Sequence, residues 1–261
     1  MGKIDDIQAY KEWTEYHRSL KRDKAADNLS PVERKKKLEK LEANVIEWIL
    51  FFFSEFAKYP FTKFHKKAIK RITTNMEWYE VLSWSRELAK STIVFMCMMY
   101  LVLTGKKKNV LLISNSHENA VRLLEPYKKA FESNSMLKAY YGDLREFGSW
   151  TADEFTLTTG ATFRAIGALE SPRGTRKDAV RPDTALVDDF DTDADCRNPD
   201  ILKKKWEWFE EALFPTRSIS EDLLVVFCGN LIALDCCVKR AGDKADHWDI
   251  VNIRDKEGKS S

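Results

Sequence analysis

Residues 77–103 have the sequence EWYEVLSWSRELAKSTIVFMCMMYLVL. Residues 77–83 have the composition of a β-strand, and residues 91–103 form an apolar stretch that predicts a helix buried on nearly all sides. Between them, residues 84–92 (WSRELAKST) form a short polar turn. A strand, a tight turn and a helix that starts with Lys-Ser are the parts of a phosphate-binding loop, or P-loop. This stretch therefore predicts an α/β fold arranged around a phosphate-binding turn.

The chemistry of such a loop gives each residue type a purpose. Backbone N–H groups of the turn and of the helix N-terminus hold the phosphates. Lys90 would reach the β- and γ-phosphates, and Ser91 would bind Mg²⁺. Trp84 and Ala89, however, stand where a P-loop normally has glycine. A Lys-Ser-Thr sequence is also an ordinary helix start, so this motif alone leaves that interpretation open. The candidate phosphate-binding residues are Ser85, Arg86, Glu87, Leu88, Ala89, Lys90, Ser91 and Thr92.

Strands and helices alternate on the C-terminal side of the loop. Apolar strands are predicted at 109–114, 184–187 and 223–228, helices at 117–131 and 198–214, and a hairpin at 155–159 and 162–168. On the N-terminal side, helices are predicted at 5–22 and 61–73, and one helix runs from the N-cap Ser30 to Tyr59-Pro60. This alternation predicts a largely parallel sheet flanked by helices, with a helical region leading into it.

Two of the apolar strands end in residues that could serve a nucleotide. Asp188 and Asp189 follow one strand, and Gly229 and Asn230 follow the other. Ligands of open α/β sheets bind at the carboxyl ends of the strands. There one carboxylate can hold Mg²⁺ and the next can orient or deprotonate the attacking water, while an amide could sense the γ-phosphate. An acidic loop and a simple turn are the alternative interpretations.

The overall composition limits the class of protein. The chain has 43 Lys+Arg and 41 Asp+Glu, for a net charge of +2, and the basic excess lies in residues 1–71. With 44% hydrophobic residues it can bury a core, which excludes disorder as the main state. The apolar runs at 45–57 and 93–103 are too short or too interrupted by charge to span a bilayer. Five cysteines without C-x-x-C spacing indicate a reducing cytoplasm.

Taken together, the motifs resemble the ATPase domain of the large terminase subunit of tailed bacteriophages, the motor that packages DNA. That family is a P-loop NTPase of the additional-strand (ASCE) type. Its early loop arginine is similar to Arg86, and its Arg-Gly-x-Arg, Arg-Pro-Asp and acidic strand end are similar to residues 173–176 and 181–189. Its coupling motif resembles residues 228–230, and the aromatic-rich stretch 59–65 resembles its adenine-contacting region. The resemblance covers residues 59–240.

The resemblance implies ATP and Mg²⁺ as the cofactors and gives roles to the acidic residues. Lys90 and Ser91 would bind phosphate, and Ser91 and Asp188 would hold Mg²⁺. Asp189 would be the catalytic residue that orients the attacking water, although the family often has glutamate at this position. Asp191 is the alternative for that role.

The remaining implied roles concern coupling and partners. Arg86 would sense phosphate, Asn230 would couple hydrolysis to movement, and Arg173 or Arg176 would be an arginine finger that acts on a neighbouring subunit. The implied partners are double-stranded DNA, further copies in a homo-oligomeric ring, the small terminase subunit and the portal protein. The implied location is the host cytoplasm, with no membrane contact.

The motif positions also divide the chain. We expect an N-terminal helical region at 1–58 packed on the core, a P-loop ATPase core at 59–245, and the start of a linker at 246–261. The family usually continues into an RNase-H-like nuclease domain. Since the chain ends at residue 261, soon after Asn230, it has no room for a second α/β domain. We therefore expect an isolated ATPase domain without nuclease activity.

Two other functions stay open at this point. The first is a helicase-like P-loop ATPase that acts on other nucleic acid, although further helicase motifs are lacking. The second is a non-catalytic protein-binding module, in which Trp84 and Ala89 close the phosphate cradle. Binding of a nucleotide with Mg²⁺ separates the ATPases from the module.

Overall fold

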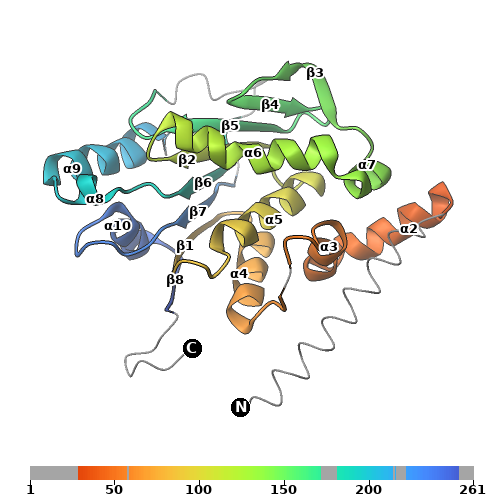
Figure 1. Ribbon diagram of the computed structural model, residues 1–261, viewed down its shortest axis with the longest axis horizontal. Coiled ribbons are helices and arrows are strands. Elements are labelled where there is room, and N and C mark those ends of the chain that lie inside the picture. Colours follow the sequence, from red (N-terminus) through yellow and green to blue (C-terminus); the bar gives the residue numbers. More distant parts are fainter. Residues whose placement is uncertain (1–28, 58, 172–180, 214, 216–221, 253–261) are drawn as a thin grey trace, which may run out of the picture.

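The computed structural model describes residues 29–57, 59–171, 181–213, 215 and 222–252. These residues form one eight-stranded sheet with helices on both faces (Figure 1). In their order across the sheet, the strands are β3 (Arg145–Trp150), β4 (Glu154–Leu157), β5 (Thr162–Gly167), β2 (Asn109–Ser114), β6 (Thr184–Asp188), β7 (Leu224–Cys228), β1 (Trp78–Trp84) and β8 (His247–Val251). All strands from β5 to β8 in this order are parallel, whereas β3 and β4 pair antiparallel. The predicted α/β fold with a mostly parallel sheet is confirmed.

The order of the central strands brings the predicted motifs to one edge of the sheet. Strand β1 leads into the P-loop, β6 ends in Asp188, and β7 lies between them. In the register of these strands, Cys228 of β7 is paired with Leu82 on one side and Asp188 on the other. One strand inserted between the two motif-bearing strands is the ASCE arrangement. Because parallel strands end at the same edge, residues that follow them are brought together.

The helices form a layer on each face of the sheet. One layer contains α2 (Pro31–Glu42), α3 (Val45–Phe52), α4 (Lys63–Thr74), α5 (Lys90–Leu103), α6 (His117–Ser133) and α7 (Ser135–Tyr141). The other contains α8 (Asp193–Cys196), α9 (Pro199–Glu207), the π-helical turn η1 (Trp208–Leu213) and α10 (Cys237–Lys244). Successive side chains of a strand point to opposite faces of the sheet, so each strand packs against both helix layers. Leu82 and Leu112 pack against the first layer, and Val81 and Leu111 pack against the second.

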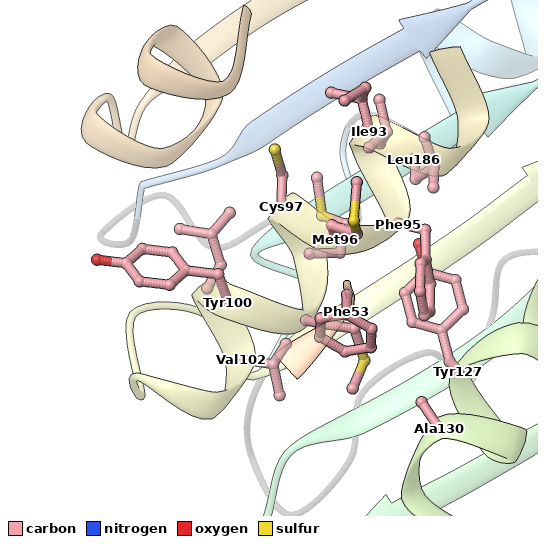
Figure 2. Packing of buried hydrophobic residues seen from close by; sticks show 14 of the residues in the cluster. Phe53, Ile93, Phe95, Met96, Cys97, Tyr100, Val102, Tyr127, Ala130 and Leu186 are labelled. Carbon is pink, nitrogen blue, oxygen red and sulfur yellow. The ribbon is translucent and has the colours of Figure 1, made fainter. Parts of the chain in front are cut away.

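Helix α5 holds the centre of the first layer. Every residue from Ile93 to Val102 is buried, as the apolar sequence predicts. Phe95 packs against Phe53 after α3 and against Tyr127 of α6, with ring centroids 5.3 and 4.9 Å apart (Figure 2). Each such side chain contributes about 1.5–3 kcal/mol by leaving water. The helix that starts in the P-loop is therefore firmly fixed in the core.

The N-terminal region differs from the expected single helix. Ser30, the predicted N-cap, forms a capping box with Glu33 at the start of α2. Helix α2 ends at its C-cap, Ala43. Asn44 then caps a second helix, α3: its side-chain oxygen accepts hydrogen bonds from the N–H groups of Ile46 and Glu47. Asn44 is a strong N-cap residue and starts a new helix here. The helix predicted at 5–22 lies outside the described residues.

The expected domain boundary at 245/246 is wrong. Residues 247–251 form β8, which pairs in parallel with β1 and is an edge strand of the sheet. Strand β3 and helices α7 and α10 are also absent from the sequence-based expectation. None of the helices in the described part of the chain has the length and apolar character that crossing a membrane requires.

Candidate functional site

The P-loop lies between the end of β1 and the start of α5. Ala89 precedes the helix and has a left-handed backbone (φ 57°, ψ 24°), and Glu87 has φ 70°. Glycine adopts this conformation without steric cost, whereas other residues do so rarely. The missing glycine at position 89 therefore does not prevent the turn, because the alanine takes the same backbone conformation.

Trp84 fills the position of the first missing glycine. It is the last residue of β1 and is fully buried. Its ring packs edge-on against Phe64, at 4.9 Å between centroids, and lies 5.5 Å from the ring of His65. Trp84 thus belongs to the core beneath the loop, and its side chain does not line the cavity described below.

His65 connects helix α4 to the loop. Its Nδ1 accepts the N–H of Thr62 at 3.3 Å, so the ring proton is on Nε2, which donates to the carbonyl oxygen of Leu88 at 3.0 Å. Burial lowers the pKa of His65, and this favours the neutral form that the two hydrogen bonds require. The sequence placed His65 only in an aromatic-rich stretch, and no sequence signal indicated this contact with Leu88.

The side chains of Ser91 and Asp188 are in contact at the carboxyl ends of the central strands. The Ser91 hydroxyl donates to Oδ2 of Asp188 at 2.6 Å, and Oδ1 of Asp188 accepts the N–H of Asp189 at 3.1 Å. Burial raises the pKa of Asp188 to about 6, against the opposing effect of the Ser91 hydrogen bond. A buried carboxylate beside a hydroxyl fits Mg²⁺, since hard oxygen ligands suit this ion and its charge would favour the ionised form.

One cavity of about 420 Å³ collects the predicted residues. Its lining consists of Ser85, Arg86, Glu87, Leu88, Ala89, Lys90, Ser91, Thr92, Asp188, Asp189 and Asn230. These residues come from three separate places in the sequence. The lining thus combines the loop with one lysine, one arginine, three carboxylates and one amide, a set of groups that could bind a nucleoside triphosphate.

A second cavity of about 260 Å³ adjoins the first. It shares Arg86, Asp189 and Asn230 with the first cavity, and Asn115 and Asp191 also line it. Asn115 directly follows β2, and sequence reasoning missed it because that strand end carries no acidic or glycine signal. The three shared residues lie where the two cavities meet.

The two candidate water-orienting aspartates differ in their positions. Asp189 has a left-handed backbone (φ 46°) and lines both cavities. Asp191 lines only the second, and its Oδ2 accepts the N–H of Val238 at 3.2 Å in the first turn of α10. The geometry therefore favours Asp189 for a role beside the phosphates and gives Asp191 a role at the start of α10.

The candidate trans-acting arginines fall outside the described part of the chain. These are Arg173 and Arg176. Arg181, the next arginine in the sequence, is described and is exposed to solvent.

A further cavity of about 960 Å³ lies between the end of α3 and helices α6 and α7, with Phe52, Phe56 and Met136 in its lining. None of the residues predicted for nucleotide binding lines it.

Comparison with known proteins gives a fold-level match. No protein-family model matches the sequence, and no curated protein matches it significantly. The large terminase of bacteriophage HK97 is similar in structure, with a TM-score of 0.55 and 13% identity over 84% of this chain and 45% of that chain. Two structures of the large terminase ATPase domain of Thermus phage P74-26, one of them a mutant, give TM-scores of 0.48 and 0.43 at 14% identity, over 77% of this chain and 84% and 83% of theirs.

Of these three structures, only the HK97 terminase has a TM-score above 0.5, so it alone is used to assign the fold. At 13% identity the similarity concerns the fold alone, and this chain spans less than half of the length of the HK97 protein. This chain therefore has the fold of the matched part of that large terminase, in agreement with the resemblance of its motifs.

Proposed function

We propose that the chain is a Mg²⁺-dependent ATPase that drives double-stranded DNA into a phage procapsid. The observation that carries this proposal is the common cavity: the loop 85–92, Asp188, Asp189 and Asn230 all line it. A terminase fold with an intact constellation of this kind is what an ATP-driven motor needs. A module that had lost its nucleotide would not need to keep these groups together.

The proposed roles follow from the position of each group. Lys90 neutralises charge on the β- and γ-phosphates, and the N–H groups at the start of α5 bind the phosphate oxygens. Ser91 and Asp188 would hold Mg²⁺, which when bound polarises the phosphate oxygens. Asp189 orients the attacking water and accepts its proton. Arg86 and Asn230, at the junction of the two cavities, respond to the loss of the γ-phosphate.

The partners belong to the same proposal. The chain would act in a homo-oligomeric ring in the host cytoplasm, with the small terminase subunit, the portal protein and a nuclease domain. Arg173 or Arg176 would reach the site of a neighbouring copy. Hydrolysis by the isolated chain is then expected to be slow, so binding must be measured beside turnover.

The direct test is Lys90→Ala. We expect nucleotide affinity to fall clearly and hydrolysis to fall by at least about 100-fold, since removing one group that stabilises developing charge has effects of about 10²–10³. Lys204→Ala is the matched control, because Lys204 is an exposed lysine of α9 outside the cavity. Calorimetry with an ATP analogue and Mg²⁺ measures binding, and phosphate release measures turnover.

Each outcome separates the candidate functions. Equal activity in Lys90→Ala and the parent protein would remove the assigned site. Failure of the parent protein to bind any nucleotide would support the protein-binding module. Stimulation of hydrolysis by single-stranded nucleic acid, with no response to duplex DNA, would support the helicase-like ATPase.

A further inference from the structure

Helix α4 has one face made of lysines. Lys63, Lys66, Lys67 and Lys70 follow the i, i+3, i+4, i+7 spacing of a single helix face, and all four are exposed. The opposite face carries Ala68, Ile69 and Ile72, which are fully buried. The helix therefore presents a continuous cationic row on its solvent side.

Within the described part of the chain, no acidic side chain pairs with this lysine face. Helix α4 contains no aspartate or glutamate, and none of the four lysines forms an ion pair with another described residue. The other strong cation of the helix, Arg71, is already used: it binds Glu80 and Asp249, each at 2.7 Å. Four lysines without a described acidic partner repel one another at this spacing, and a bound polyanion would relieve this repulsion.

The basic run of α2 is different. Glu33, Glu39 and Glu42 are interspersed with its lysines. Lys37 lies over the ring of Phe51 at 4.5 Å, and Arg34 donates to the carbonyl of Ala139. Part of its positive charge is therefore compensated or used in packing, so α4 is the better candidate for an anionic partner.

The same helix also touches the proposed nucleotide site. Its inner side carries Phe64, which packs on Trp84, and His65, which donates to the Leu88 carbonyl. Figure 1 shows α4 beside α5, the helix that starts in the P-loop. A partner bound to the lysine face would thus contact the same helix that supports the loop through Phe64 and His65.

We propose that Lys63, Lys66, Lys67 and Lys70 form a binding face for the backbone phosphates of double-stranded DNA. The inference rests on the proposed function and names the surface by which the motor holds its substrate. The row is about 10 Å long at about 1.5 Å per residue, and DNA carries about one negative charge per 1.7 Å of its axis. Contacts of this kind position a duplex without reading its sequence.

The test is the full chain with Lys63, Lys66, Lys67 and Lys70 all changed to Gln. Binding to a labelled duplex of about three helical turns is measured by fluorescence anisotropy between about 50 and 200 mM salt. We expect affinity at low salt to fall by at least about tenfold. The slope of log K against log salt should become shallower by about 0.9 for each phosphate that the variant no longer neutralises.

A matched variant controls for net charge. Lys203, Lys204, Lys239 and Lys244 are exposed lysines of α9 and α10, and changing them to Gln removes the same charge from another surface. This variant should bind the duplex nearly as the parent protein does. Equal loss in both variants, no loss in the α4 variant, or no duplex binding by the parent protein would each overturn the inference.

Two further measurements test whether the lysine face serves nucleotide binding or a membrane surface instead of DNA. Nucleotide binding and DNA-free hydrolysis should be unchanged in a second variant in which only Lys66, Lys67 and Lys70 are changed to Gln, because these three lysines lie outside the stretch 59–65 and do not line the cavity; loss of these properties would contradict a role confined to DNA. Vesicles of neutral and anionic phospholipid are the second probe. If they bind the parent protein as tightly as the duplex does, and the α4 variant loses this binding, the face is a membrane surface and the proposal fails.

Discussion

Residues with strained backbone conformations cluster at the proposed nucleotide site. Among the described residues, four that are not glycine have a positive φ: Glu87, Ala89, Leu169 and Asp189. Two are in the P-loop and one follows Asp188. Such backbones cost about 1–3 kcal/mol each and persist where the surrounding structure enforces them. Here the buried helix α5 on one side and strand β6 on the other hold these residues in place.

The alanine at position 89 allows a direct test of this strain. Ala89→Gly removes the steric conflict between the Cβ and the left-handed backbone, which stabilises the native state by about 1–2 kcal/mol. It also increases the backbone entropy of the unfolded state, which costs about 0.4–1 kcal/mol of stability. We expect a net gain in stability of between about 0 and 1.6 kcal/mol, with nucleotide affinity retained or improved. Urea unfolding and calorimetry measure both. A clear loss of stability would show that the alanine conformation in solution is not left-handed.

At the scale of elements, we expect the stability of helix α4 to depend on the protonation state of His65. Nδ1 of His65 accepts the Thr62 N–H, and it loses this capacity when it is protonated. Burial lowers the pKa of His65 below its ordinary value of 6.5, so the native state binds fewer protons than the unfolded state. The free energy of unfolding should be fully maintained above about pH 6.5 and should decrease as the pH falls through this value.

The matched variant for this dependence is His65→Gln. Glutamine is suited to this capping position and can both accept and donate, but it does not titrate. The difference in unfolding free energy between about pH 7.5 and 5.5 should therefore become smaller than in the parent protein. If the two proteins lose stability equally on acidification, His65 is not the source of the effect.

The elements also show which parts of the fold can be predicted from sequence. Strand β2 and helix α5 are predicted closely, because long apolar runs decide them. Strands β3 and β8 are missed because much of their surface stays exposed or half-buried and their residues do not alternate clearly. Pairing with β4 and β1 stabilises them, and a single sequence does not contain that information.

At the scale of the whole molecule, the site depends on sheet order. The sequence singles out residues 85–92, Asp188, Asp189 and Asn230 as candidates, because they follow predicted strands and carry suitable chemistry, and these residues line one cavity. It does not identify Asn115 or the His65 contact with Leu88, since both arise from the way in which distant segments pack. Strand ends are therefore visible in the sequence, whereas the residues that support them require the fold.

Strand β8 extends this dependence to the far end of the described chain. The carbonyl of Val251 accepts the N–H of Ser85, the first loop residue, at 2.8 Å. Trp248 donates to Ser83 at 2.9 Å, and Asp249 binds Arg71. The edge strand thus holds both the P-loop and α4.

Two shortened chains test whether β8 is part of the folded core. A chain that ends at residue 245 lacks β8, and we expect it to lose about 3 kcal/mol or more, which lowers Tm by roughly 6–12 °C for a domain of this size. Its nucleotide affinity should also fall, because Ser85 loses its anchor. A chain that ends at residue 252 keeps all eight strands and should match the full chain in both measurements. If the two shortened chains melt and bind alike, β8 is not needed for the core, and the loop is held by β1 and α5 alone.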